Sequence, residues 1–113
     1  MSTSDAARRL RDVVDNADRI SAYVTGLELA AFVADSKTID ACERCLERIA
    51  EAVVKLGPER FAVVAPDVPF ERVRGLGNVL RHAYDDIDLT ILFGLVRNEV
   101  PALRQAALRA LEG

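Results

Sequence analysis

Side chains that can act on a phosphate ester gather in one segment of this 113-residue chain, between residues 74 and 85. The segment reads RGLGNVLRHAYD and holds the only histidine, one of the two tyrosines and two of the six glycines. On a helix with about 100° of rotation per residue, its polar side chains share one face. These polar residues are Arg74, Asn78, Arg81, His82 and Asp85. The one-sided arrangement predicts a binding or catalytic site.

Histidine and arginine together suit the cleavage of RNA without a metal ion. Such cleavage needs a base near the ribose 2′-hydroxyl, an acid at the leaving oxygen and a cation on the phosphate. Histidine suits either proton role because its unperturbed pKa is about 6.5. Arginine suits the phosphate because its planar fork can donate two hydrogen bonds to adjacent oxygens. One chain has a single histidine, so a two-fold dimer is the simplest way to supply both an acid and a base.

Gly75 and Gly77 flank the polar face in a segment where no turn is expected. Each glycine costs a helix on the order of 1 kcal/mol relative to alanine, and each permits close approach of a ligand or a second helix. The alternative interpretation is a plain solvated helix face with an incidental histidine. Such faces usually mix charges of both signs. The glycines and the predominance of positive charge therefore favour a site.

Apolar residues spaced three and four apart predict the helices that position this segment. The opposite face of the segment itself collects Val73, Leu76, Val79, Leu80 and Ala83. The first helix is expected to begin near Ser4 and to be interrupted at Gly26. Its apolar series is Ala6, Leu10, Val13, Ala17, Ile20, Val24 and Leu27. A central helix over residues 38–56 has a second series at Ile39, Cys42, Leu46, Ile49, Val53 and Leu56. Both series are typical of helices that pack in a bundle.

Caps and helix breakers predict the remaining boundaries. A short helix is expected over residues 27–33, with Ser36 or Thr38 capping the central helix, and residues 59–67 are expected to be irregular. The segment with the polar face belongs to a helix over residues 68–84, capped by Asp67. Arg72 falls on the apolar side of that helix, so its stem should pack while its guanidinium reaches water.

The last helix is expected over residues 89–111, with Asp88 as its N-cap. Pro101 lies inside its apolar pattern and should kink the helix or split it in two. No stretch of useful length alternates with the period of a strand. The sequence therefore predicts an all-α fold, an antiparallel up-and-down bundle of four to five helices that forms one domain over residues 5–111.

Composition limits the possible functions. Fifteen basic residues against eighteen acidic ones give a net charge of −3, which excludes bulk electrostatic attraction to nucleic acid. Binding to RNA would need a local basic patch. No apolar run approaches the roughly 20 residues that span a bilayer, and the N-terminal MSTSD lacks the apolar stretch of a signal peptide. A cytoplasmic protein without membrane contact is expected.

The two cysteines, Cys42 and Cys45, are expected to fill the core. They form a lone Cys-x-x-Cys without a second pair or a nearby histidine, so a zinc site would lack ligands. A redox pair would need a βαβ context, which this helical pattern does not provide. No cluster of metal ligands accompanies the polar face, and no cofactor is expected.

Leu76 to Tyr84, with Asn78, His82 and Tyr84 in the spacing N-x-x-x-H-x-Y, resembles the signature of the HEPN-domain ribonucleases, specifically their HepT-like toxin branch. The flanking segments DSKTIDA (35–41) and VPAL (100–103) are also similar to that branch. The resemblance covers about residues 5–111 in helix order as well as in motif.

This resemblance implies a dimeric helical bundle whose motif helices meet across the two-fold axis in a composite cleft. Active members are metal-independent endoribonucleases of toxin–antitoxin systems. Their partner is a minimal nucleotidyltransferase antitoxin, which in some systems attaches AMP to the motif tyrosine. On this sequence, the resemblance makes His82 the catalytic histidine, Asn78 the polar residue one turn before it, and Tyr84 the candidate for AMPylation.

The family arginine has no direct counterpart. The family pattern is Rx4–6HxY, most often with the arginine immediately before the asparagine, where this chain has Gly77. Arg74 lies one turn earlier and Arg81 lies next to His82, and either could hold the phosphate. A HEPN-like module with a degraded motif, which binds nucleotide or scaffolds a nucleotidyltransferase, is the alternative function. A purely structural helical dimer is a third interpretation.

Overall fold

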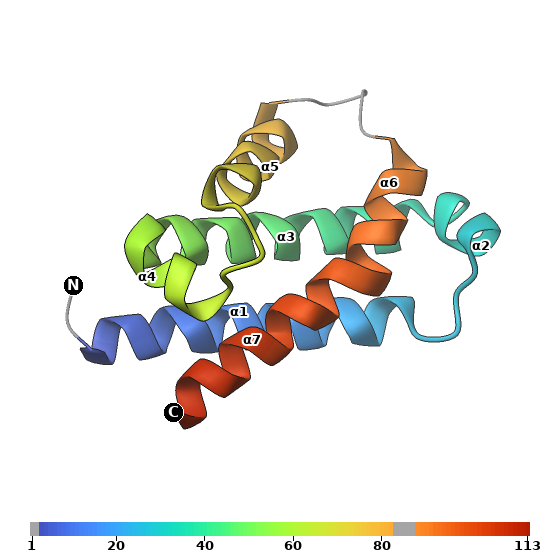
Figure 1. Ribbon diagram of the computed structural model, residues 1–113. Helices are drawn as coiled ribbons and strands as arrows, with labels where there is room; N and C mark the ends of the chain where they lie inside the picture. The colour runs from blue at the N-terminus through green and yellow to red at the C-terminus, as the bar shows by residue number, and fades with distance from the viewer. Residues whose placement is uncertain (1–2, 83–87) are drawn as a thin grey trace.

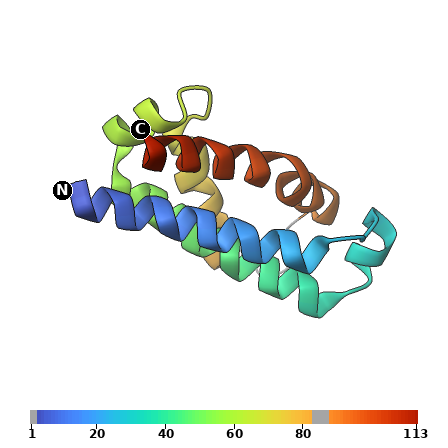
Figure 2. The same cartoon turned by 90° about the horizontal axis from the view of Figure 1, so that it is seen from below.

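Two long antiparallel helices, α1 (Thr3–Val24) and α3 (Ser36–Leu56), form the frame of the molecule (Figures 1 and 2). The computed structural model describes residues 3–82 and 88–113. α7 (Val100–Glu112) packs along α1, and α5 (Phe70–His82) packs on α3. All elements of the described residues are helical, which confirms the predicted all-α bundle.

The predicted apolar series of α1 and α3 lie in the core. Every member is buried except Leu27 and Ile39, which are half-buried. Phe32 of the short helix α2 (Leu29–Val33) and Ile20 of α1 have no exposed surface at all. The core residues predicted from the three- and four-residue spacing are confirmed here because each helix turns one apolar stripe to the interior.

The start of α3 differs from the prediction. Asp35, rather than Ser36 or Thr38, is the N-cap, because its Oδ1 accepts a hydrogen bond from the Thr38 amide at 3.1 Å. The Thr38 hydroxyl donates to Asp35 Oδ2 at 2.7 Å. These two bonds hold the pKa of Asp35 below its usual value. Similarly, α1 already includes Thr3, so Ser4 lies inside the helix and not at its cap.

The segment that was expected to be irregular contains the helix α4 (Pro58–Val64). Gly57, with a φ of 94°, ends α3, and Pro58 begins α4 at the position where a missing N–H costs nothing. Phe61 is 1% exposed and fixes the short helix to the core. The prolines at 66 and 69 exclude a long helix but not one of two turns.

The C-terminal helix changes its winding immediately before Pro101. α6 (Leu89–Gly94) begins at Asp88, whose Oδ1 accepts hydrogen bonds from Thr90 and Ile91, as predicted. A π-helical turn, η1 (Leu95–Glu99), then leads into α7, and the Val100 amide donates to the Leu95 carbonyl five residues back. The predicted interruption at Pro101 is confirmed, and it takes the form of this wider turn.

The thiols of Cys42 and Cys45 confirm the core-filling prediction, since they are free and 0% and 1% exposed. Burial, with a smaller contribution from neighbouring Cys45, raises the pKa of Cys42 to about 11. Only the thiolate is nucleophilic, so the raised pKa leaves little Cys42 thiolate at pH 8, and burial shields both thiols from a reagent. Because the reagent must wait for the core to open, we expect Ellman's reagent to modify the native protein at least about 100-fold more slowly than the urea-unfolded protein. Rapid modification of the folded protein would contradict this assignment.

Candidate active site

The polar segment forms most of α5, which begins at Phe70 after Pro69, so Asp67 does not cap it. α5 buries or half-buries Val73, Leu76, Gly77 and Leu80, and these residues follow the i, i+3, i+4, i+7 spacing of a helix packed on its neighbours. Arg74 and Asn78 are exposed on another side. The described part of the predicted polar face, Arg74 and Asn78, therefore lies outward.

The apolar side of α5 departs from the prediction at two positions. Val79 is 50% exposed instead of core-facing, and Gly77, at the edge between the apolar and polar faces, is buried. The buried stripe runs from Leu76 through Leu80 and Val73 to Gly77 at its edge, where a glycine permits close approach of the backbone to its neighbours. Ala83, also expected on this side, lies outside the described residues.

Gly75 is the glycine that offers room for a partner. It is exposed, and a Cβ atom built on it would meet no heavy atom within 4 Å. Gly77, in contrast, is buried within the chain. The prediction of a close-approach surface on α5 therefore rests on Gly75 alone.

Arg74 forms an ion pair that the sequence analysis missed. Its Nη2 lies 2.6 Å from Oε2 of Glu71, one turn earlier, and both side chains are more than half exposed. Residues three apart are neighbours on a helix surface, so the sequence spacing of Glu71 and Arg74 could have predicted this ion pair. An exposed pair of this kind contributes about 0–1 kcal/mol, so a phosphate can replace the carboxylate.

The structure describes the other predicted site residues to different extents. Asn78 is exposed on α5, and Arg81 and His82 are the last two residues of that helix. The structure does not describe the side chains of Arg81 and His82. Tyr84 and Asp85 lie entirely outside the described residues. The helical backbone puts residues 74, 78 and 81–82 on successive turns, while their chemical roles stay predictions.

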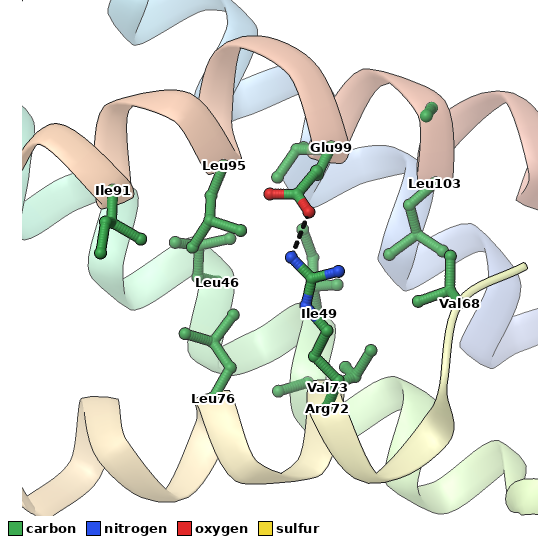
Figure 3. Close-up of a pocket in the computed structure, with 13 residues that line it drawn as sticks. Leu46, Ile49, Val68, Arg72, Val73, Leu76, Ile91, Leu95, Glu99 and Leu103 are labelled. Carbon is green, nitrogen blue, oxygen red and sulfur yellow. Dashed lines mark hydrogen bonds and ion pairs between the residues drawn. The ribbon is translucent and has the colours of Figure 1, made fainter.

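An apolar groove of about 360 Å³ runs along the opposite side of α5, away from Arg74 and Asn78 (Figure 3). α5 forms one wall, α3 the floor, and the C-terminal helix the other wall. The lining residues are Leu46, Ile49, Ala50, Val68, Arg72, Val73, Leu76, Ile91, Leu95, Glu99, Val100, Ala102 and Leu103.

Arg72 bridges the two walls of the groove. Its Nη2 forms an ion pair and hydrogen bond with Oε1 of Glu99, on the π-helical turn (Figure 3). The side chains are 62% and 48% exposed. The expected behaviour of Arg72, with a stem along apolar surface and a solvated head, is thus confirmed, and Glu99 is the partner that the sequence did not reveal.

Within the described residues, no group of three or more His, Cys, Asp or Glu side chains is arranged to hold a metal ion. Over the same residues, no helix combines the length and apolarity needed to cross a membrane.

Comparison with known proteins gives a consistent family. Residues 13–110 match the family described as Ribonuclease HepT-like. A Methanocaldococcus jannaschii protein with the name "Putative RNase" is 35% identical over 101 residues, which span 89% of this chain and 83% of that protein. A Thermococcus cleftensis protein named as a probable ribonuclease HepT is 28% identical over 95 residues, 84% of this chain and 86% of its own length. No solved structure shows a significant match to the chain.

Proposed function

Because the chain belongs to the HepT-like ribonuclease family, whose members are HEPN-type RNA-cleaving enzymes, we propose that it is the toxin of a toxin–antitoxin pair. In this proposal it is a metal-independent endoribonuclease that acts in the cytoplasm. The observation that supports it best is the family match over residues 13–110, which includes the motif helix α5 with its exposed Arg74 and Asn78.

The proposed site is composite and needs a homodimer. His82 of one copy takes the proton of the ribose 2′-hydroxyl, and the 2′-oxygen attacks the phosphorus. His82 of the second copy gives a proton to the departing 5′-oxygen, which leaves a 2′,3′-cyclic phosphate and a 5′-hydroxyl. Arg74 and Arg81 hold the phosphate, and Asn78 positions it by hydrogen bonding. The exposure of Arg74 and Asn78 supports access of RNA to this face.

The proposed partner is a minimal nucleotidyltransferase antitoxin that silences the toxin by attaching AMP to Tyr84. An adenylyl group two residues after His82 would add bulk and negative charge beside the phosphate-binding residues. Both effects oppose the binding of RNA.

A degraded HEPN module that binds nucleotide or scaffolds a nucleotidyltransferase is the second candidate. Glycine at position 77 is the observation that favours it, since the family most often has its arginine there. In this chain, however, residue 77 belongs to the buried stripe of α5, whereas Arg74 is exposed. This placement supports phosphate binding by a different arginine, Arg74, and not the loss of RNA cleavage.

The proposal is tested by incubating the purified protein with a structured RNA and with the same RNA carrying 2′-O-methyl groups. We expect cleavage of the unmodified RNA only, 2′,3′-cyclic phosphate ends, and no effect of EDTA. Nucleotide binding without any cleavage would instead support the degraded module. Cleavage of 2′-O-methyl RNA would contradict the proposed attack by the 2′-oxygen.

A further inference from the structure

We propose that the ion pair between Arg72 and Glu99 sets the orientation of the motif helix α5, so that both residues are positioning residues for RNA cleavage. This role rests on the proposed function, because it concerns the same site. Neither side chain contacts the RNA in this proposal. They act through Arg74 and Asn78, which α5 bears on its other flank.

α5 is held mainly from one side. It packs along α3 and touches α4, whereas its described residues make few or no close contacts with the C-terminal helix. The apolar groove separates α5 from that helix (Figure 3). Within the stripe of α5 that faces inward, Gly77 and Leu80 are buried, but Val73 and Leu76 are only half-buried. A helix with so few buried side chains reorients at low cost, because little apolar contact is lost.

Arg72 and the polar residues lie on opposite flanks of this inward stripe. With about 100° of rotation per residue, Arg72 lies about 90° to one side of the middle of the stripe. Arg74 and Asn78 lie about 110° and about 150° to the other side. A contact that fixes the Arg72 flank therefore fixes how far the other flank turns toward solvent. Loss of that contact lets α5 roll on α3 and displaces the phosphate-binding side chains.

Glu99 belongs to an anchored element. It is the last residue of the π-helical turn η1, two residues after Arg97. Arg97 Nη1 donates a hydrogen bond to the Leu27 carbonyl at 2.8 Å, and its guanidinium carbon lies 5.3 Å from the centre of the Phe93 ring. Val96 of the same turn is 2% exposed. The turn is thus fixed to the core and to the α1–α2 connection, and α5 is the element that the ion pair restrains.

The exposure of the pair sets the size of the expected effect. The two side chains are 62% and 48% exposed. An exposed pair of this kind shifts an equilibrium by about two- to fivefold. Reversing one charge removes the attraction and adds a repulsion of similar size, which gives about 4- to 25-fold. A pair of modest strength matters here because little packing fixes α5.

Charge reversal tests this role. We expect Arg72→Glu and Glu99→Arg each to lower kcat/KM for one labelled RNA about 4- to 25-fold. The double variant restores the pair with the charges exchanged and should return kcat/KM to within about threefold of the wild type. Glu99→Gln removes only the attraction and should lower kcat/KM about two- to fivefold. It replaces a reversal variant that circular dichroism shows to be unfolded.

Glu99→Arg separates positioning from a general attraction of RNA. The substitution makes the chain more positive, which by charge alone would strengthen RNA binding, whereas positioning predicts slower cleavage. Glu112→Arg makes the same charge change at an exposed position at the end of α7 and is the matched control. Its kcat/KM should not fall. A raised kcat/KM in Glu99→Arg, or a double variant no better than the single variants, would overturn the proposal.

A distance measurement detects the orientation of α5 without RNA. Spin labels on Val79→Cys of α5 and Gln105→Cys of α7, both exposed positions, give a distance distribution by electron paramagnetic resonance. An excess of unlabelled chain restricts the signal to distances within one chain, and brief labelling spares the buried Cys42 and Cys45. We expect a narrow distribution in the wild type and the double variant and a broader or shifted one in each reversal variant. The same distribution in all four proteins would contradict the proposal.

The two measurements keep this proposal and the proposed function distinguishable. If the wild type cuts RNA and both reversal variants keep its kcat/KM, the positioning role is wrong and the proposed function stands. If the wild type never cuts RNA, but the distance distribution responds to charge reversal and recovers in the double variant, the ion pair orients α5 and the proposed function is wrong.

Discussion

Replacing His82 with alanine is expected to lower the rate of RNA cleavage by about 100- to 10,000-fold, the usual contribution of a positioned acid or base. The melting temperature should change little, because position 82 falls outside the helical spacing of the apolar series Val73, Leu76 and Leu80. Single-turnover cleavage of one labelled RNA, combined with thermal unfolding, measures both quantities.

His82→Asn is the matched variant for this experiment. It keeps a polar side chain of similar size but cannot take and give a proton near neutral pH, so it should be as inactive as His82→Ala. Undiminished cleavage by either purified variant would mean that the activity belongs to another residue or to a contaminating nuclease.

The second large effect is expected at the arginines that replace the family position. Arg74→Ala and Arg81→Ala should each slow cleavage about 30- to 1000-fold, which corresponds to roughly 2–4 kcal/mol for a lost charge-assisted contact to the phosphate. Arg109→Ala, an exposed change on α7, is the control and should leave the rate unaltered. Full activity in both Arg74→Ala and Arg81→Ala would refute this assignment.

The ion pair between Arg74 and Glu71 refines that expectation. Arg74 must give up Glu71 when it binds a phosphate, so Glu71→Gln should lower KM about two- to fivefold without reducing kcat. An unchanged or higher KM would indicate that Arg74 does not contact the RNA. In contrast, Gly77→Arg should lower the melting temperature instead of improving catalysis, because residue 77 is buried.

Most of the fold could be predicted because α1, α3 and the C-terminal helix each have one continuous apolar stripe. The helix starts were less predictable, since Asp35, Ser36 and Thr38 are all good caps and only the three-dimensional geometry selects Asp35. α4 was missed because a helix of seven residues is too short to show a period, and a single buried residue, Phe61, fixes it.

The errors on α5 have a common physical cause. A helical wheel assigns the inner face from apolar side chains, so it counts Val79 and ignores Gly77. Packing instead buried the glycine backbone and left the valine half exposed. The bridge between Arg72 and Glu99 spans 27 residues, and no local pattern predicts a contact at that distance. The polar face itself was predictable because it depends only on the helical period.

The π-helical turn at Leu95–Glu99 holds one residue more than regular α-helical winding would hold over the same rise. Its wider winding takes up the rotation of about 100° that an extra residue would otherwise impose on α7. Leu92 and Val96 therefore face the same core as Ala107 beyond the turn. Deleting one residue from the turn should restore regular winding with α7 still in phase with α6. We therefore expect a single-residue deletion to be tolerated within Leu95–Glu99 and to be destabilising in the middle of α7, where no wider turn can absorb the rotation.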